Sequence, residues 1–407
     1  LFYILLLPQM KVLHITFSNK GGAAIGVMRL HYALKKKNIK SKIFFYNKYL
    51  EKKRIKEFFN VHEFLWKSKV FLRRLFLKFM SKRLSKESVS LNWLNNIDIK
   101  KINNFESFDI VHLHWVGNEM ISIKEISLID KPIVWTLHDM WPFCGAEHFS
   151  YQQRHLKQYS TASRNINEKG FDFDKFIWRL KKKYLEKKKL NFISPSNWIK
   201  INFIKSHTFK NYNIKTLPYI IDINYWKKNK IKKKNKKIIL LFSATSSVNY
   251  RKGFIYLVSA INKYLDKSKF ILYVIGDKPK LFDSVQIEKK FFGNIKSDKI
   301  LKKIYSASDI FVLPSIAESF GQVFIEAGSI GLPCICFKNT AATEIIKHKI
   351  NGYSARFKST RDLAFGINWC KKNLLNSKSE KNIRDMTHKN FSSNKIIDKY
   401  VKYYKKN

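Results

Sequence analysis

Short apolar runs alternate with stretches of helical periodicity along most of the chain, which predicts strand–helix–strand units in both halves. The strands expected in the first half are 11–17, 41–47, 109–115, 132–138 and 191–196. Those expected in the second half are 237–245, 270–277, 309–315 and 333–337. Helical spacing of apolar residues falls between them, for example over 25–37, 253–265 and 297–308. This alternation predicts an α/β fold with parallel sheets, each covered by helices on both faces.

The junction after the run 309–315 is the most informative part of the chain. The strand is expected to end at Pro314-Ser315, and a helix is expected from Gly321 to Gly331. A helix start exposes backbone N–H groups and the positive end of the helix dipole, which suits a phosphate. Glu318 precedes this helix and Glu326 lies inside it, where a carboxylate can bind sugar hydroxyls. The alternative is a capped helix with two surface glutamates.

Residues 305–337, YSASDIFVLPSIAESFGQVFIEAGSIGLPCICF, resemble the donor-site segment of glycosyltransferase family 4, a retaining family with the GT-B fold. The similarity extends along nearly the whole chain from Met10. Its further segments are KVLHITFSNKGGAA at 11–24, VHLHW at 111–115, PIVWTLHDMWPFCG at 132–145, RKG at 251–253 and NGYSA at 351–355. Within the family, the chain most resembles the colanic acid and exopolysaccharide branch.

The resemblance implies two Rossmann-like domains that face each other across a cleft, in agreement with the length of 407 residues. The segment 216–226 resembles the crossing between such domains. The implied domains are an acceptor-side domain at 10–218 and a nucleotide-sugar-binding domain at 219–390. A final helix within 391–407 is implied to pack back on the first domain.

The family also implies roles for two cations. Lys252 matches the lysine that contacts the donor diphosphate, and Arg251 stands beside it. Without the resemblance, nothing distinguishes Lys252 and Arg251 from the other Lys and Arg residues, of which the chain has 79 in all. The family commonly has an Arg several residues earlier, where this chain reads SATSSVNY at 243–250, so that role is vacant or has moved to Arg251.

In the first half, the turn NKGGAA at 19–24 opens a helix, and its glycines allow close approach of a ligand. The family match makes Gly22 a donor contact, whereas spacing alone indicates a tight βα turn. His138 follows a strand end, where α/β sheets bind ligands. Resemblance assigns it to a donor-sugar hydroxyl, and the alternative is a structural histidine. His112 and His114 share a strand face, but a third metal ligand is not evident, so packing is expected.

In the donor segment, resemblance implies that Glu326 holds the ribose hydroxyls and that Glu318 contacts the sugar. The backbone N–H groups of Phe320 and Gly321 would face the diphosphate. Ile295 matches the position whose backbone reads the base. The implied catalytic residues are therefore His138, Lys252 and Glu318, with no metal and no cofactor besides the nucleotide-sugar substrate.

The formal net charge of +49 raises the question of a polyanionic partner. The lysines are scattered over every segment and accompany many Asn, Ile and Phe, which is typical of an AT-rich coding sequence. Composition bias is therefore favoured over an anionic membrane surface, and both over nucleic acid. A nucleic-acid-binding protein would be expected to show arginine clusters within a recognised module.

Residues 69–84, KVFLRRLFLKFMSKRL, combine large apolar residues at near-helical spacing with Lys and Arg. This pattern predicts either a basic amphipathic helix on anionic lipid or an ordinary helix packed on the first domain. The run LFYILLLP at the start is too short to span a bilayer. Residues 1–9 are interpreted as an upstream extension of the reading frame. Four cysteines without metal-ligand spacing favour a cytoplasmic protein, which could lie peripherally on the membrane.

The resemblance thus implies a retaining hexosyltransferase, which is expected to be metal-independent. Its donor would be a UDP- or GDP-sugar and its acceptor a surface glycan, expected to be lipid-linked. Two alternatives remain open: a nucleotide-sugar epimerase on the same fold, and a basic nucleic-acid-binding protein.

Overall fold

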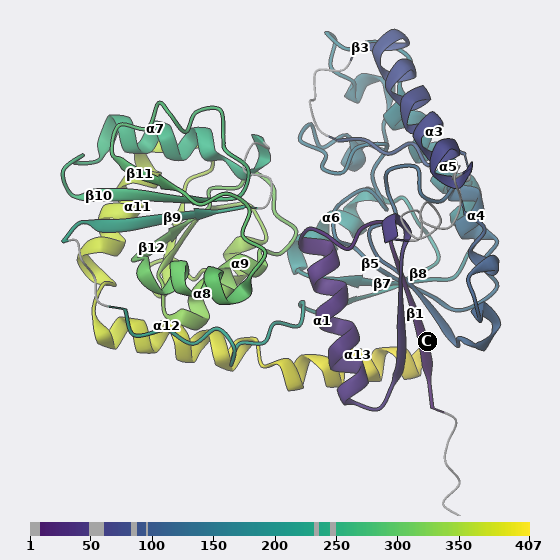
Figure 1. Ribbon diagram of the computed structural model, residues 1–407. Helices are drawn as coiled ribbons and strands as arrows, with labels where there is room; N and C mark the ends of the chain where they lie inside the picture. The colour runs from purple at the N-terminus through teal and green to yellow at the C-terminus, as the bar shows by residue number, and fades with distance from the viewer. Residues whose placement is uncertain (1–8, 49–60, 83–87, 95–96, 232–235, 245–249) are drawn as a thin grey trace, which may run out of the picture. The chain divides into compact units, whose positions relative to one another are not determined.

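The computed structural model describes residues 9–48, 61–82, 88–94, 97–231, 236–244 and 250–407 (Figure 1). The chain forms two compact units. Unit 1 comprises Leu1–Tyr219 with Ile397–Asn407, and unit 2 comprises Ile220–Ile396. Each unit is built on its own parallel six-stranded sheet.

The sheet of unit 1 has the strand order β2-β1-β4-β5-β7-β8. Its strands are β1 (Lys11–Thr16), β2 (Lys40–Phe45), β4 (Ile110–Leu113), β5 (Ile133–Thr136), β7 (Leu190–Ser194) and β8 (Tyr212–Thr216). Every neighbouring pair is parallel. Since the chain passes from β1 outward to β2 and then to β4 on the other side, the strand order reverses between β1 and β4.

Helices connect these strands in unit 1. They are α1 (Gly22–Lys36), α3 (Val61–Phe79), α4 (Ile123–Ser127), α5 (Phe173–Leu185) and α6 (Asn197–Ser206). A short antiparallel pair joins β3 (Ser81–Lys82) to β6 (Lys169–Gly170). The last helix, α13 (Ser393–Lys406), contributes its residues from Ile397 onward to unit 1.

The sheet of unit 2 has the order β11-β10-β9-β12-β13-β14. Its strands are β9 (Ile238–Ser243), β10 (Phe270–Ile275), β11 (Glu288–Phe291), β12 (Ile310–Val312), β13 (Cys334–Phe337) and β14 (Gly352–Ala355). All neighbours are again parallel. The chain leaves β9 toward β10 and β11 and then returns to β12, so here the order reverses between β9 and β12.

The helices of unit 2 lie on both faces of its sheet (Figure 1). They are α7 (Phe254–Tyr264), α8 (Asp298–Ala307), α9 (Gln322–Ile330), α10 (Ala342–Ile345), α11 (Thr360–Asn373) and α12 (Ser377–Asn390). Helix α7 packs with α11, and α9 packs with α8 and α12. The predicted α/β class with two Rossmann-like halves is therefore confirmed.

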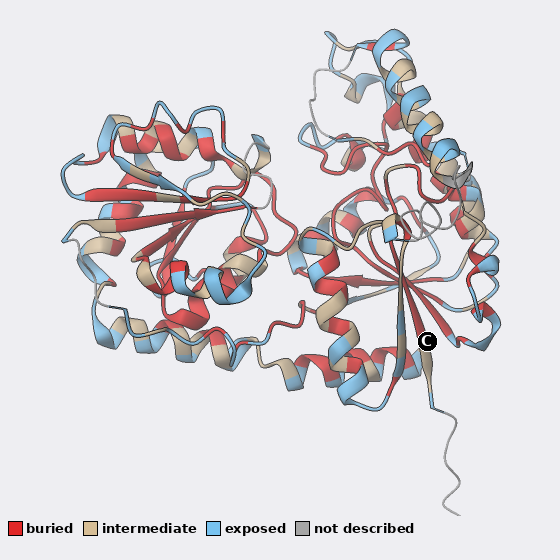
Figure 2. Ribbon diagram, in the orientation of Figure 1, coloured by how far each residue is buried: buried red, intermediate tan, exposed pale blue. Residues whose placement is uncertain are grey.

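The core of each unit follows its central strands, which are buried along their whole length (Figure 2). The near-continuous apolar runs in the sequence match this burial, because strands covered on both faces have no polar side. No helix within the described ranges combines the length and the apolar composition that crossing a bilayer requires.

Two predicted boundaries were wrong. The strand expected at 309–315 is only β12 (Ile310–Val312), and the following residues form an irregular loop that carries Glu318. The helix expected within 69–84 begins earlier and is α3 (Val61–Phe79), after which Ser81–Lys82 form a strand. Residues 83 and 84 lie outside the described residues, as do 1–8 of the expected upstream extension.

Candidate functional site

The point where the strand order of unit 2 reverses brings two sequence-predicted segments together. Open α/β sheets bind ligands at the carboxyl ends of the strands that flank this point. Here these are the ends of β9 and β12. The short helix η5 (Tyr250–Lys252) follows β9, and the loop 313–321 follows β12. Arg251 donates its Nη1–H to the carbonyl of Ala317 at 2.8 Å, and Ile316 donates its N–H to the carbonyl of Arg251 at 2.8 Å.

Lys252 and Glu318, which are 66 positions apart in sequence, form an ion pair in this crevice. Lys252 Nζ donates to Glu318 Oε2 at 2.7 Å, and Arg251 Nη1 lies 3.7 Å from the same oxygen. The exposed fraction of the side chain is 16 % for Lys252 and 10 % for Glu318. Two cations thus surround one carboxylate in this crevice.

The electrostatics of the pair follow from its burial. Burial alone would raise the pKa of Glu318, but the charges of Lys252 and Arg251 outweigh it and the pKa is lowered. Burial lowers the pKa of Lys252, and the carboxylate of Glu318 opposes that shift. Since the two groups are hydrogen-bonded and each favours the charged form of the other, we assign the pair as ionised.

Two glycines allow the backbone of this crevice to fold so tightly. Gly253 has a φ of +75°, and a Cβ placed there would lie 1.8 Å from the carbonyl oxygen of Pro314. Gly321 has a φ of +97° and precedes the first residue of α9. Both conformations are unfavourable for residues with a side chain. The glycines of RKG and ESFG therefore hold η5 against the loop 313–321 and set the start of α9.

The remaining predicted residues of unit 2 lie nearby in the fold. Phe320 is buried, and its ring packs edge-to-face on Phe391 at 6.1 Å between centroids. Glu326 is only 8 % exposed, so it is not the surface glutamate of the alternative interpretation. Ile295 follows β11 and is half-buried. Because all strands are parallel, the residues that follow β9, β11 and β12 lie at the same edge of the sheet.

Unit 1 gathers its predicted residues at the corresponding edge of its own sheet. Gly22 begins α1 directly after β1, and the preceding Gly21 has a φ of +90°. His138 follows β5 and is buried. Its Nδ1 lies 2.7 Å from the hydroxyl of Tyr219, and its Nε2 lies 2.9 Å from Nδ1 of His114. Both ring nitrogens of His138 are therefore engaged by other side chains of unit 1.

Asp139 anchors the loop next to His138, a role that the sequence did not suggest. Its carboxylate accepts from Trp115 Nε1 at 2.8 Å and from the backbone N–H of Trp141 at 2.9 Å, and it lies 2.6 Å from Nδ1 of His148. The other nitrogen of His148 lies 2.8 Å from Ser90 Oγ. This order resembles a Ser–His–Asp triad, but Ser90 is 1 % exposed, so the network is structural.

Three other histidines of unit 1 lie closer together than the sequence indicated. His14 on β1, His112 on β4 and His114 just after it place one ring nitrogen each within 4.8 Å of one another. A third histidine near His112 and His114 was not evident in the sequence, and the structure shows that it is His14. His14 was missed because strand pairing, which aligns it with His112, is not readable from spacing along the chain.

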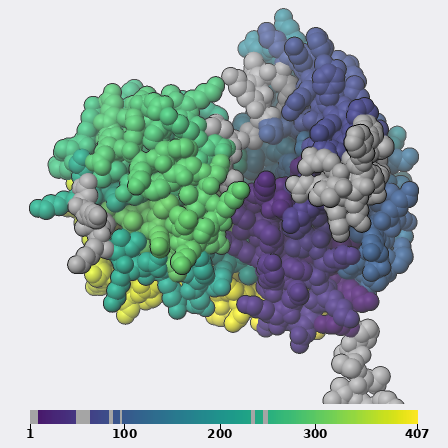
Figure 3. Space-filling view, viewed as in Figure 1, coloured from purple at the N-terminus to yellow at the C-terminus, as the bar shows by residue number. Residues whose placement is uncertain are grey.

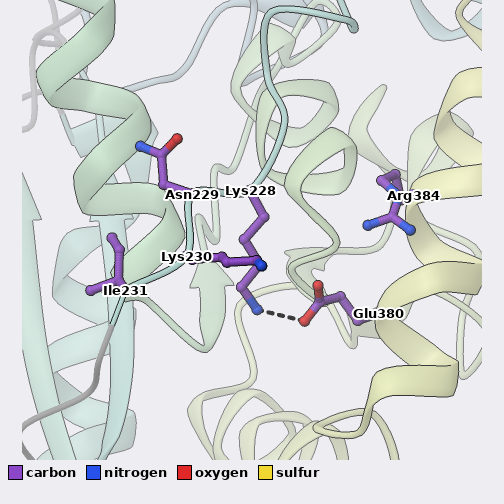
Figure 4. A pocket seen from close by; sticks show the side chains of 6 residues that line it. All are labelled: Lys228, Asn229, Lys230, Ile231, Glu380 and Arg384. Atoms are coloured by element: carbon purple, nitrogen blue, oxygen red, sulfur yellow. Dashed lines mark hydrogen bonds and ion pairs between the residues drawn. The ribbon is translucent and has the colours of Figure 1, made fainter.

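Unit 2 also has a basic groove, and Figure 4 shows the side chains that line it. Its volume is about 580 Å³, and it is lined by Lys228, Asn229, Lys230, Ile231, Glu380 and Arg384. Asn229 donates its N–H to Ser306 Oγ at 3.0 Å, and Ser306 lies just before β12 begins. The groove is thus at the amino ends of the strands, away from Lys252 and Glu318.

Helix α3 lies on the surface of unit 1 (Figure 3). Five of its large apolar side chains are exposed: Phe64, Leu65, Phe71, Leu72 and Phe79. Arg73 instead points inward, where it donates to the carbonyl of Val89 at 3.1 Å and lies 3.5 Å from Glu119. One side of the helix therefore packs on unit 1, and the other side is exposed.

The segment that carries these residues is similar to a known family. Residues 224–389, which include Arg251, Lys252, Glu318 and Glu326, match the family model described as glycosyl transferases group 1. This matched segment lies within unit 2, which is therefore similar to group 1 glycosyl transferases. The match spans less than half of the chain.

Two curated relatives are similar over part of the chain. An uncharacterized glycosyltransferase of Methanocaldococcus jannaschii is 27 % identical over 208 residues, 46 % of this chain and 51 % of the relative. The N-acetyl-α-D-glucosaminyl L-malate synthase of Bacillus anthracis is 29 % identical over 157 residues, 36 % of this chain and 40 % of the relative. The chain thus spans about half the length, or less, of these relatives.

Similarity to solved structures covers nearly the whole chain. The Anabaena protein HepE in complex with UDP and glucose superposes with a TM-score of 0.62 and 16 % identity, over 98 % of this chain and 100 % of that one. At this identity the similarity shows the fold alone, and the fold is GT-B.

Proposed function

We propose that unit 2 gives the chain glycosyltransferase activity, and that the chain transfers a hexose from a nucleoside-diphosphate sugar. One observation carries the proposal. Arg251 and Lys252 converge on Glu318 at the point where the strand order of unit 2 reverses, directly before the start of α9. When the nucleoside diphosphate leaves, negative charge develops on it. Cations and backbone N–H groups that are already in position stabilise this charge.

Glu318 and Lys252 have complementary tasks in this proposal. The carboxylate holds Lys252 and Arg251 in place before the donor binds, and its negative charge offsets part of their positive charge. A diphosphate carries more negative charge than Glu318 and draws the two cations toward it. Glu326, buried in α9, binds the ribose hydroxyls, and the backbone at Ile295 contacts the base. The structural similarity to a protein bound to UDP supports UDP as the first donor nucleotide to test.

Transfer proceeds with retention at the sugar and without a metal ion in this proposal. Lys252 and Arg251 supply the positive charge that a divalent cation would otherwise provide. The proposal rests on those two side chains, on the resemblance to a retaining family, and on the similarity to curated glycosyltransferases.

The test is acceptor-dependent release of UDP or GDP by the purified full chain, with UDP-glucose, UDP-N-acetylglucosamine and GDP-mannose as donors and a mixed extract of bacterial lipid-linked oligosaccharides as acceptor. Lys252→Met should lower turnover at least about a hundredfold, the scale found when one transition-state donor is removed. Lys230→Met, which removes an exposed cation from the amino-edge groove, serves as the matched control.

Two results would contradict the proposal. Equal activity of the two variants would exclude Lys252 from the donor site. Interconversion of the sugar nucleotide without release of the nucleotide would identify an epimerase on this fold instead.

We further propose that the acceptor is lipid-linked and that α3 brings the chain to an anionic membrane surface. Phe64, Phe71 and Leu72 lie on one exposed stripe of α3, because residues seven apart recur on the same side of a helix. The exposed Lys67, Arg74 and Lys78 flank this stripe. An apolar stripe beside a basic one is the pattern of helices that lie in the plane of anionic lipid headgroups.

Liposome co-sedimentation tests this surface. Each basic residue near an anionic bilayer contributes about 1 kcal/mol, so replacing both Arg74 and Lys78 by Gln should weaken binding by about 2 kcal/mol. The same two substitutions at the exposed Lys227 and Lys230 in unit 2 are the control. Equal losses in both variants would attribute binding to the diffuse charge of the whole chain.

A further inference from the structure

A line of four hydrogen-bonded rings lies buried in unit 1. It runs from the hydroxyl of Tyr219 to His138, then to His114, and ends at His14. The successive distances are 2.7 Å from Tyr219 Oη to His138 Nδ1, 2.9 Å from His138 Nε2 to His114 Nδ1, and 2.9 Å from His114 Nε2 to His14 Nδ1. All three histidines are buried, and we call them the histidine file.

The file allows only two arrangements of protons. A neutral imidazole has one N–H donor and one acceptor nitrogen, so all bonds in the file must run in the same direction. Either each histidine donates from Nε2 toward His14, or each donates from Nδ1 toward Tyr219. The first arrangement makes the hydroxyl of Tyr219 a donor to His138, and the second makes it an acceptor.

The buried end of the file distinguishes these two arrangements. His14 Nε2 is buried and has no hydrogen-bond partner among the described residues. In the first arrangement this nitrogen carries a proton that no acceptor receives. In the second it carries only a lone pair. Because an orphaned buried N–H is rarer in proteins than an under-satisfied acceptor, the second arrangement is favoured.

The surroundings of the file keep its rings neutral. Burial lowers the pKa of His14 to about 3 and that of His138 to about 4, although the nearby carboxylate of Asp139 opposes the second shift. The pKa of His114 is lowered well below its usual value, first by burial and then by the neighbouring imidazoles. Because the three imidazoles are neutral, each has one N–H donor and one acceptor nitrogen, and the hydrogen bonds between them have a defined direction.

A metal ion at His14, His112 and His114 explains these contacts less well. The two nitrogens of His112 lie 2.6 Å from the hydroxyl of Tyr404 and 2.7 Å from Oγ1 of Thr136. Those of His114 are both used within the file. A metal could use the unpartnered Nε2 of His14, but it would have to break one of these bonds at His112 and one at His114, whereas the file uses them as they stand.

We propose that His14 and His114 are positioning residues that hold His138 as a neutral imidazole with its proton on Nδ1. Since His138 lies at the carboxyl edge of the unit 1 sheet, its neutral ring then stands at the edge where such sheets bind ligands. A role of this ring in transfer rests on the proposed glycosyltransferase function, whereas the proton arrangement does not.

Two substitutions at the end of the file test its direction. The amide introduced by His14→Asn can donate to His114 Nε2 as the wild-type ring does. The carboxylate introduced by His14→Asp can only accept, so it should draw a proton onto His114 Nε2. The two variants have nearly the same shape and differ chiefly in this donor, which makes them a matched pair.

Nitrogen NMR of the full chain, labelled with ¹⁵N in its histidines, reports which ring nitrogen carries the proton. We expect Nδ1–H signals for His14, His114 and His138 in the wild type, and the same for His114 and His138 in His14→Asn. In His14→Asp we expect a proton on Nε2 of His114. Turnover of His14→Asp should fall about tenfold relative to His14→Asn, with the KM for the donor unchanged.

The outcomes separate this inference from the proposed function. Nε2–H signals for His114 and His138 in the wild type would overturn the inference, even if His14→Asp does not fold. Identical tautomers in both variants, or loss of the Nδ1–H signals on adding Zn²⁺ in a 1:1 ratio, would also overturn it. If the expected tautomers are found but no sugar donor is turned over, the histidine file stands and the proposed function fails.

Discussion

The ion pair between Lys252 and Glu318 gives the sharpest test of the unit 2 site. We consider Lys252→Met, Glu318→Gln and the double variant. Both side chains are largely buried, at 16 % and 10 % exposure, so removing one leaves the other desolvated without its partner. Breaking a buried pair in this way costs about 3–5 kcal/mol, and we expect the lower value because Arg251 can still approach Glu318.

The double variant measures the interaction itself. Removing both charges together also removes the desolvation cost, so its loss of stability should be smaller than the sum of the single losses by about 2 kcal/mol. Urea unfolding monitored by tryptophan fluorescence gives the three free energies of unfolding. The exposed pair Lys228–Glu380, with side-chain exposures of 35 % and 30 %, is the control and should show less than about 1 kcal/mol in the same cycle.

The pH dependence of the free energy of unfolding tests the ion pair independently, and the pKa of Glu318 determines its direction. The folded pKa of Glu318 is lowered, so its contribution is present above the ordinary carboxyl pKa of 4.5 and is lost as the pH falls below it. Wild type and Glu318→Gln should therefore approach each other in stability as the solution is acidified. A coupling energy near zero, or a stability difference that does not change between pH 7 and pH 3, would refute an ionised pair.

Three further predictions concern other parts of the chain. Glu326→Ala should weaken UDP binding by roughly 1.5–3 kcal/mol in calorimetry. Because Glu326 is buried, a melting curve must show that the variant is folded. Unchanged affinity in a folded variant would remove Glu326 from the ribose site. The pKa of Lys181 is lowered by burial to about 7, although its Nζ donates to the carbonyls of Cys144 and Gly145. The stability of wild type relative to Lys181→Met should therefore rise between pH 7 and pH 10, where only the unfolded chain keeps the proton, and a flat difference would contradict this. Transfer should survive EDTA, and a loss of turnover that Mg²⁺ or Mn²⁺ restores would exclude the metal-independent mechanism.

The alternation of apolar runs determined the α/β class of this protein, because strands buried on both faces are apolar throughout and can be recognised locally. Motif residues determined the candidate site in unit 2. Arg251, Lys252 and Glu318 were selected from two short segments, and each segment follows a recognisable strand. The structure adds that Gly253 and Gly321 of this site both have positive φ values, which other residues avoid.

Only the tertiary structure decided which of these residues meet. Lys252 and Glu318 are brought together because β9 and β12 are neighbours, and strand order is a long-range property that local spacing does not contain. The same holds for His14, which reaches His114 through the pairing of β1 with β4. The burial of single side chains was likewise not predictable from the sequence. The sequence indicates that Arg73 is one more cation of an amphipathic helix, but in the structure it points inward toward Glu119. Sequence therefore determined the elements and the residue types, and the packing of the elements determined which charges and rings share a site.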